Sequence, residues 1–356
     1  MKRFIFLFVA LLCCVSATAQ VVFVATLQHE GTTTQYYGQD ALNSAYNAAV
    51  DGDVITLSDG SFTWSAGNFN KSITLRGAGI NGKNRTIVSG SDFNVATRNK
   101  DLTTHIEGIR FQTTIYIYNE DAQYEKGKIE FVKCVCQSVY TSYSGTPNTD
   151  SPKVNFYNCI LGDMNFTQKQ CYPKYNVVNC YIINLYGGSN KSASVGNNTS
   201  VFDHCVIEIK NTFYAPYKYY YLNFLNSIFV WSWGNHSGGD TNYILPNTAT
   251  ATNCLSVKKS TLFNSLIVNK GNMTAGTCAE VFKTFKGGGY NDIETFELTD
   301  EAKAAYIGAD GTEVGMQGGM MPFNTTVQYP IITTFNADVR TDKEGKLNVE
   351  IAVDGK

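Results

Sequence analysis

The sequence predicts an all-β chain that winds as a single parallel β-helix (a β-solenoid), with an N-terminal capping helix and a short C-terminal β tail. The first observation is a short phrase, ending in a small residue, that recurs between residues 108 and 254 at spacings of 21 to 27. The second is that each copy alternates apolar and polar residues, while no 3.6-residue period runs through residues 100–270. Short strands repeating at this period indicate coils that stack on one another.

The first twenty residues, MKRFIFLFVALLCCVSATAQ, have the pattern of a signal peptide. Two cations precede a short apolar run, and a small-x-small site ends at Ala19. No later stretch approaches about 20 apolar residues, so we expect no membrane insertion. Lipid attachment at Cys13 is disfavoured because Leu12 precedes it. We therefore predict a protein that is exported and is periplasmic, cell-surface or extracellular.

Composition argues against nucleic acid or an anionic membrane as the partner. The chain has 28 basic and 30 acidic residues, and removing the signal peptide would leave 26 and 30. Charged residues make up only 16%, whereas Tyr and Phe number 22 and 21. A polar, weakly charged surface suits an exported protein that contacts neutral glycans.

The aligned repeat gives columns of similar residues. The small column is Gly108, Cys134, Cys159, Cys180, Cys205, Ser227 and Cys254. Three positions earlier, the column is apolar and mostly aromatic: Phe131, Phe156, Val177, Phe202, Phe224 and Ala251. Two positions later stand Cys136, Leu161, Ile182, Ile207, Phe229 and Ser256. Equivalent positions of stacked coils lie about 4.8 Å apart, so like side chains can pack on one another in the interior.

The residue before the small one marks a bend between two strands. This column is Lys133, Asn158, Asn179, His204, Asn226 and Asn253. Asn tolerates the left-handed conformation, and its amide could bond to the next Asn along the stack. We interpret the cysteines as small, buried, stacked side chains rather than structural disulfides, although one adjacent pair would be close enough to oxidise. Cys171 and Cys278 lie outside the column and stay unassigned.

The other elements follow in chain order. Residues 21–28 are expected to form a first strand, and residues 40–50 an amphipathic helix, with Asp40 near its N-cap, that plugs the first coil. Loop insertions are expected at residues 145–152, 187–200 and 234–242. The tail alternates like a hairpin around residues 342–346. The predicted units are the signal peptide 1–19, the β-helix with its cap 20–320, and the β tail 321–356.

Two stretches resemble a known family. The opening "ALNSAYNAAVDGDVITLSDGSFTW", followed by "SITLRGAG", resembles the start of right-handed parallel β-helix proteins of the pectin-lyase-like superfamily. Those proteins begin with a capping helix, a Gly-Asp turn, an apolar strand and a coil rich in small residues. The stretch "YIGADGTEVGMQGG" resembles the closing coil of secreted bacterial members. The resemblance implies a single-stranded right-handed parallel β-helix but no particular activity, because this fold hosts lyases, hydrolases, adhesins and inert binders.

Catalytic candidates are few. Hydrolases need paired carboxylates, and lyases need a base, often with calcium bound to acids. The "NTD" at residues 148–150 matches one polygalacturonase motif, but its companion motifs are absent, so we attribute it to chance. "VFDHC" (201–205) faintly resembles a pectate lyase motif, yet no arginine lies between Arg110 and Arg340 to serve as the base. The weak candidates are Asp203, His204, Lys218, His236 and Asp240. The alternative is that His204 fills a corner position and Asp203 faces solvent.

Aromatic residues are densest at residues 214–240, where Tyr and Trp faces could stack on sugar rings. The repeat register places Trp231 in one column with Asp163, Asn184 and Ile209. It places Trp233 in a second column with Asn165, Tyr186 and Asn211. If both columns point outward, they form a polar-aromatic ladder that suits a glycan; the alternative is core packing. The glycan-binding candidates are Trp231, Trp233, Tyr186, Asn165, Asn211 and Asp163.

No cofactor is predicted, and calcium is unsupported. Asp and Glu are scarce between residues 128 and 270, and no two of them share a column of the aligned repeat. The stretch "GADGTEVG" (308–315) lacks the residue spacing of a calcium-binding loop. The leading hypothesis is an exported, non-catalytic β-helix protein that binds polysaccharide or a surface glycan. The rivals are a polysaccharide lyase or glycoside hydrolase with an unrecognised site, and an adhesin that contacts protein.

Overall fold

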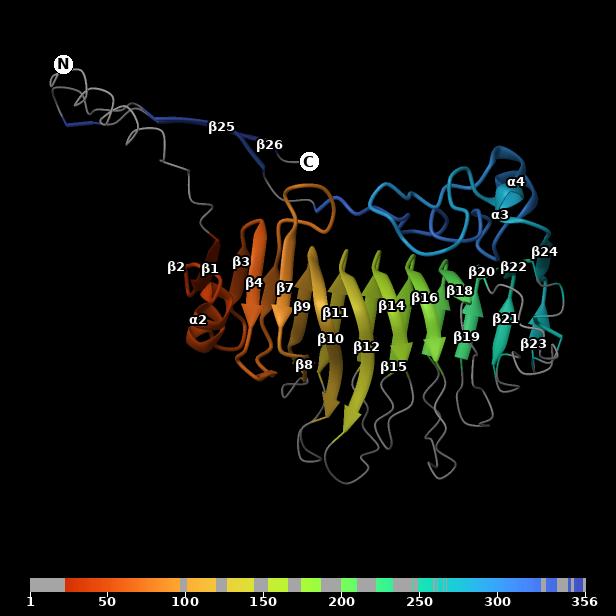
Figure 1. Cartoon of the computed structure of the whole chain (residues 1–356), viewed down its shortest axis with the longest axis horizontal. Coiled ribbons are helices and arrows are strands. Elements are labelled where there is room, and N and C mark those ends of the chain that lie inside the picture. Colours follow the sequence, from red (N-terminus) through yellow and green to blue (C-terminus); the bar gives the residue numbers. More distant parts are fainter. Residues whose placement is uncertain are drawn as a thin grey trace, which may run out of the picture.

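The computed structural model shows a mostly β chain wound as a parallel β-solenoid, as the repeat predicted (Figure 1). It describes residues 23–96, 101–119, 127–143, 153–165, 174–186, 200–209, 222–232, 245, 249–258, 260, 262–264, 266, 268–327, 331–337, 345–346 and 349–354.

Two twelve-stranded sheets form the solenoid, and each coil adds one strand to each sheet. Sheet A runs in the order β2 (Thr32–Tyr37), β1 (Val24–His29), β3 (Val54–Leu57), β6 (Thr74–Arg76), β9 (Thr103–Glu107), β11 (Lys128–Val132), β13 (Lys153–Tyr157), β15 (Lys174–Val178), β17 (Ser200–Asp203), β19 (Leu222–Leu225), β21 (Thr250–Thr252) and β23 (Val268–Lys270). Sheet B runs in the order β4 (Gly60–Trp64), β7 (Thr86–Gly90), β10 (Ile109–Asn119), β12 (Val135–Tyr143), β14 (Ile160–Asn165), β16 (Tyr181–Tyr186), β18 (Val206–Ile209), β20 (Ile228–Trp231), β22 (Leu255–Val257) and β24 (Met273–Ala275), with β8 (Phe93–Val95) beside β10 and β5 (Asn68–Phe69) beside β8.

A hairpin and a helix close the N-terminal end of the solenoid. Strand β1 pairs antiparallel with β2 and β3, whereas all later pairs in sheet A are parallel. Helix α2 (Ala41–Ala48) buries Leu42 and Ala45 against the core and carries Asp40 at its N-cap. The Tyr46 ring stacks on Phe69 at 4.8 Å between ring centroids. The helix therefore plugs the first coils as predicted, although it ends two residues earlier than expected.

The interior consists of the apolar columns that the repeat predicted. Residues three before the small position pair in register from β11 to β21 and are buried. The rings of Phe131 and Phe156 stack at 5.0 Å with planes 10° apart. The column two after the small position is likewise buried and in register in sheet B. Burial of each such large side chain contributes about 1.5–3 kcal/mol, which identifies this stack as the main stabilising element.

Left-handed residues form the corner between each strand of sheet A and the next strand of sheet B. The corner side chains have φ values between 48° and 54°: Lys133, Asn158, Asn179, His204, Asn226 and Asn253. Gly108 also belongs to this corner column, with φ 68°, because its amide bonds to Val132 O as the Lys133 amide bonds to Tyr157 O. Our alignment of Gly108 with the cysteines was therefore wrong by one residue, since glycine suits both positions.

The cysteine column completes the hydrogen bonds of the corners. The amide of Cys159 donates to Cys180 Sγ at 3.2 Å, and the Cys180 thiol donates to Val178 O at 3.2 Å. Ser227 makes the same two bonds through its hydroxyl, with Cys205 N and Leu225 O. The seven described cysteines are free and buried, and burial raises the pKa of the Cys254 thiol to about 12. The column is thus a ladder of protonated thiols that satisfies buried amides as well as filling space.

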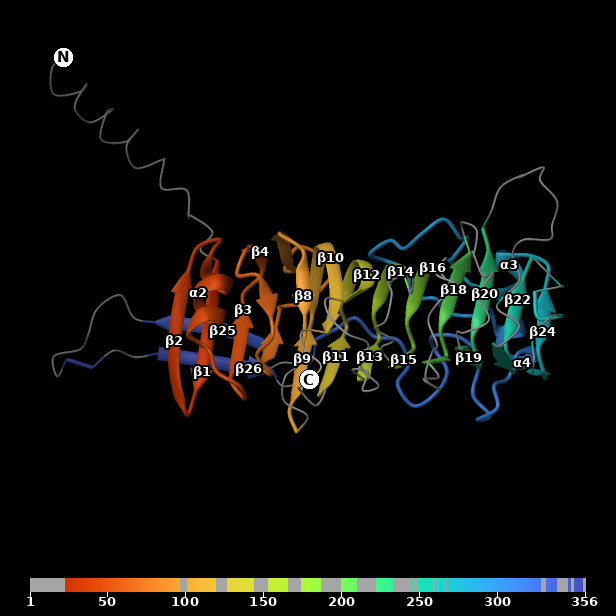
Figure 2. The same ribbon diagram turned by 90° about the horizontal axis from the view of Figure 1, so that it is seen from below.

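The chain folds back along the solenoid after its last strand, β24. Coils were expected to continue to about residue 320, but residues 278–327 instead form a layer with the short helices α3 (Cys278–Val281) and α4 (Asp300–Ala305). This layer covers the outward side chains at the start of the sheet B strands, next to the corners. Together they form a second apolar cluster that includes Tyr181, Phe285 and Phe296. Figure 1 shows it along one edge of the solenoid, and Figure 2 shows the row of strands from α2 to β24. Beyond it, β25 (Ile331–Ala337) and β26 (Val349–Asp354) pair antiparallel, the arrangement expected of the alternating tail.

Candidate functional site

The strands of sheet B change direction midway, so that their second halves present a separate outer surface. Inward side chains are three residues apart at this point instead of two, for example Leu161 and Met164. A Cβ at Gly162 would collide with the backbone oxygen of Gln137, so this point of β14 requires glycine. Strand β10 carries one extra residue between Phe111 and Thr114, a β-bulge. The first halves lie under residues 278–327, and the second halves carry the candidate site.

Two rows of outward side chains cross these second halves in register; we call them the sheet B ladder. The first row is Asn68, Asn94, Tyr116, Tyr140, Asn165 and Tyr186. The second row is Thr114, Ser138, Asp163 and Asn184. All of these residues whose side chains are described are partly exposed. The ladder is therefore a surface of amides, hydroxyls and aromatic rings.

Contacts between neighbouring coils hold the ladder side chains in place. Asn94 Nδ2 donates to Asn68 Oδ1 at 3.2 Å, and Asn184 Nδ2 donates to Asp163 Oδ1 at 2.8 Å. The rings of Tyr116 and Tyr140 lie 5.7 Å apart between centroids and are inclined by 39°. Such contacts restrict the rotamers before any ligand arrives, which lowers the entropic cost of binding.

The register expected for the glycan-binding candidates is confirmed where it is described. Asp163 pairs with Asn184, Asn165 pairs with Tyr186, and Ile209 pairs with Trp231. The Trp231 side chain is partly buried at the end of β20. Tyr116 was missed because the bulge and the misplaced Gly108 shift the first coil out of alignment, whereas Tyr140 shares the column of Asn165 by spacing and was overlooked. Trp233, Asn211, Lys218, His236, Asp240 and the side chain of Tyr186 lie outside the described residues.

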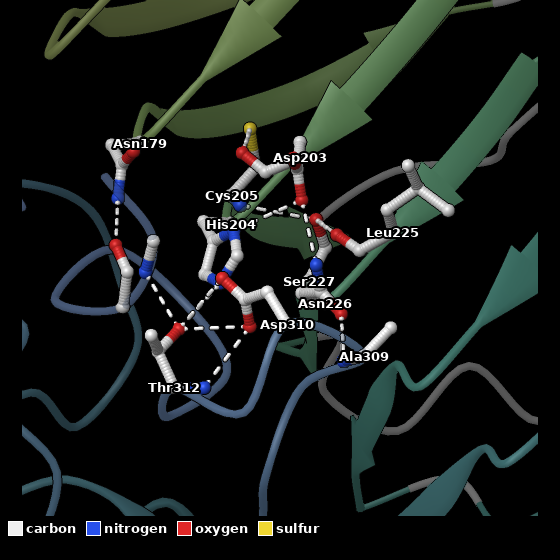
Figure 3. A network of polar contacts seen from close by, with 12 residues as sticks. Asn179, Asp203, His204, Cys205, Leu225, Asn226, Ser227, Ala309, Asp310 and Thr312 are labelled. Atoms are coloured by element: carbon white, nitrogen blue, oxygen red, sulfur yellow. Dashed lines mark hydrogen bonds and ion pairs between the residues drawn. The ribbon is translucent and has the colours of Figure 1, made fainter. Parts of the chain in front are cut away.

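His204 occupies its expected corner position, and its ring joins two parts of the chain (Figure 3). Nδ1 lies 2.9 Å from Asp203 Oδ1, and Nε2 lies 3.2 Å from Thr312 Oγ1 and 3.5 Å from Asp310 Oδ2. The side chain is 3% exposed, and Gly318 and Gly319 lie close to the ring. The expectation that Asp203 faces solvent holds in part, because Asp203 is 32% exposed but accepts bonds from both His204 and Asn226.

The other corner side chains bind the same returning segment, residues 306–327, which we call the strap. Asn179 Nδ2 donates to Met316 O and to Gly318 O, both at 2.8 Å. Asn226 Oδ1 accepts from Ala309 N at 2.7 Å, and Lys133 Nζ donates to Thr326 O at 2.6 Å. The expectation that these amides bond to one another along the stack is therefore wrong: their described partners include strap backbone atoms.

This arrangement assigns His204 a structural task. Asp203, His204 and Thr312 align as carboxylate, imidazole and hydroxyl, an order also used to activate nucleophiles. Here, however, the Thr312 hydroxyl accepts from Gly319 N at 2.7 Å and contacts both oxygens of Asp310. Burial disfavours the charged form of Asp310 and so raises its pKa. Hydrogen bonds from Thr312, together with the electrostatic interaction with His204, outweigh this effect and bring the pKa of Asp310 below its usual value. The geometry therefore holds the strap on the corner.

A charged cluster that the sequence analysis missed lies on the outer face of sheet A. The His105 ring lies 3.3 Å from Glu130 Oε2 and 3.4 Å from Glu107 Oε2. These bonds raise the pKa of His105 to about 9, and the bond to His105 is the main cause that lowers the pKa of Glu130 to about 2. Aligning Gly108 with the cysteines shifted residues 103–107 by one position relative to the next coil. His105 and Glu130 therefore did not fall in the same column.

Neither a metal site nor a membrane-spanning helix is found in the described part of the chain. No group of three or more His, Cys, Asp or Glu residues there is arranged to hold a metal ion. No helix there is long and apolar enough to cross a bilayer. No protein-family model, curated protein or solved structure matches the chain. Functional inference therefore depends on the geometry of the two sheet faces.

Proposed function

We propose that this protein is exported and binds an extended, neutral polysaccharide or surface glycan along the sheet B ladder, without catalysis. The observation that carries the proposal is the in-register pair Tyr116 and Tyr140, flanked by Asn94 and Asn165 in the same row. Aromatic rings supply apolar area for the faces of sugar rings, and amides supply donors and acceptors for hydroxyls. The rungs repeat at about 4.8 Å, a spacing comparable to one unit of an extended sugar chain.

The location of the ladder supports the same proposal. It lies on the second halves of the sheet B strands, beside the first halves that residues 278–327 cover with apolar side chains. The carboxylate of Asp163 accepts the Asn184 amide, so the described rows offer mainly uncharged polar groups. The signal-peptide pattern of residues 1–19 supports export, and the opening motifs support a right-handed helix of the pectin-lyase-like superfamily.

The test is calorimetric titration of the chain from Gln20 onward with a panel of soluble neutral polysaccharides. We expect a saturating isotherm for at least one of them. Tyr140→Ala and Tyr116→Ala should each weaken it about tenfold or more, equivalent to about 1.4 kcal/mol. Tyr37→Ala is the matched control, because Tyr37 is 63% exposed on β2, away from the ladder.

Three outcomes would contradict the proposal. Equal weakening by Tyr37→Ala would mean that the ladder is not the site. Heat that continues after mixing would indicate turnover and favour the lyase or hydrolase hypothesis. Absence of heat across the panel would favour an adhesin that contacts protein.

A further inference from the structure

The outer face of sheet A carries three lysines in one row. Lys128 on β11 pairs with Lys153 on β13, and Lys153 pairs with Lys174 on β15. Neighbouring strands lie about 4.8 Å apart, so the three stems begin at that spacing. Like charges placed directly opposite one another destabilise a sheet. A ligand that carries negative charge would remove this repulsion.

The lysine row belongs to a positively charged patch on an otherwise slightly acidic chain. The outer faces of strands β6, β9, β11, β13 and β15 carry four cations, one histidine and two carboxylates: Arg76, Lys128, Lys153, Lys174, His105, Glu107 and Glu130. The patch therefore has a net charge of +2, or +3 when His105 is protonated, whereas the chain as a whole has a formal charge of −2. A surface of one sign attracts ligands of the other.

Two of the lysines are available to a ligand. Lys128 forms an ion pair with Glu130, and its side chain is 44% exposed. Lys153 and Lys174 are exposed, and within the described ranges neither forms an ion pair. Beside them, Asn155 donates to Glu130 Oε1 at 3.3 Å and Asn176 donates to the Tyr157 hydroxyl at 3.3 Å. The row is thus bordered by a second row of amides that is already fixed in place.

We propose that sheet A binds a sulfated polysaccharide, whose chain runs along the solenoid axis with its sulfate groups on Lys153 and Lys174. The row contains only lysines, whose ammonium groups act as point charges with three rotatable donors and need no planar partner. A sulfate ester is tetrahedral, has three terminal oxygens and accepts single N–H bonds from many directions. The repeat of the row matches a polymer with regularly spaced charges.

This site is distinct from the sheet B ladder, since the two lie on different sheets. The test is titration of the chain from Gln20 onward with dextran sulfate, carboxymethyl dextran of matched charge density, and plain dextran. We expect dextran sulfate to bind most tightly and to weaken as salt is added, because the contact is electrostatic. Lys153→Gln with Lys174→Gln should weaken binding about tenfold or more, equivalent to about 1.4 kcal/mol.

Lys83→Gln with Lys286→Gln is the matched control, because it also removes two positive charges and both lysines are exposed outside the strands of sheet A. Tyr140→Ala should leave dextran sulfate binding unchanged, so failure of one site does not imply failure of the other. The proposal is overturned if dextran sulfate does not bind, if the double lysine variant binds as tightly as the parent, or if carboxymethyl dextran binds equally well. Equally tight binding of single-stranded DNA would also overturn it, by indicating a general response to polyanions.

Discussion

Asn179 offers the sharpest test of how the strap is held. Its amide donates to two strap carbonyls, Met316 O and Gly318 O, and its side chain is fully buried. Asn179→Gly keeps the φ of 50° without strain but removes both donors. Each carbonyl left without a partner lowers the stability by about 1–3 kcal/mol. The substitution also removes Asn179 Oδ1, which is buried without a partner, and this raises the stability by about 1 kcal/mol. We therefore expect a loss of about 3 kcal/mol, within a range of about 1–5 kcal/mol, in the free energy of unfolding.

The control is Asn253→Gly. Asn253 has the same φ of 50°, and it follows the last corner at which a bond to the strap is described, Asn226. We expect this change to cost less than about 1 kcal/mol. Urea unfolding followed by circular dichroism measures both variants, and limited proteolysis of residues 306–327 reports directly on strap release. Equal losses in the two variants would refute the reasoning, because the strap bonds would then contribute nothing specific. Asn179→Ala should cost about 1 kcal/mol more than Asn179→Gly, because alanine is strained in the left-handed region.

Further predictions concern the thiol ladder and the charged cluster on sheet A. Cys180→Ser should retain more stability than Cys180→Ala in urea unfolding, because a hydroxyl can accept the Cys159 amide as Ser227 does for Cys205, whereas alanine leaves it unpaired at about 1–3 kcal/mol. The buried thiols should react with a thiol reagent only after unfolding; rapid labelling of the native protein would contradict the packing. The His105 pKa is raised from 6.5 to about 9, so its stabilising contribution is complete below pH 6.5 and is lost as pH rises through 9. The Glu130 pKa is lowered from 4.5 to about 2, so its contribution is complete above pH 4.5 and is lost as pH falls through 2. Stability measured by urea unfolding should therefore decline between pH 6.5 and 9, and His105→Gln should flatten that decline; an unchanged slope would contradict the network.

The repeating part of the fold could be predicted because each coil needs the same residue types at its interior and corner positions. Phe131, Phe156 and Phe202 recur because each fills the same interior position. Asn179 and its equivalents recur because each corner needs a left-handed residue. The error at Gly108 has the same origin, since glycine satisfies the small position and the corner equally well.

The strap could not be predicted because it does not repeat in the sequence, and the ladder residues of β10 could not because a bulge shifts them out of the repeat. The strap binds the corners through backbone atoms such as Met316 O and Ala309 N. Every residue type has these atoms, so the contacts produce no recognisable sequence pattern. The return of the chain along the solenoid after β24 also joins residues far apart before the strap begins, as in the Arg110–Asp292 pair at 2.5 Å. The pairing of Asn165 with Tyr186 followed from spacing alone, whereas Tyr116 was displaced by the one-residue bulge in β10.

The most direct test of glycan binding on sheet B is the dependence of affinity on chain length. Five described rungs, from Asn68 to Asn165, span about 19 Å at a coil spacing of about 4.8 Å. Calorimetry with neutral oligosaccharides of increasing length should show affinity that rises up to about four or five sugar units and then stays constant. Tyr140→Ala should flatten this rise, because it interrupts the row. Affinity that is independent of length, or that Tyr140→Ala leaves unchanged, would contradict the proposed site.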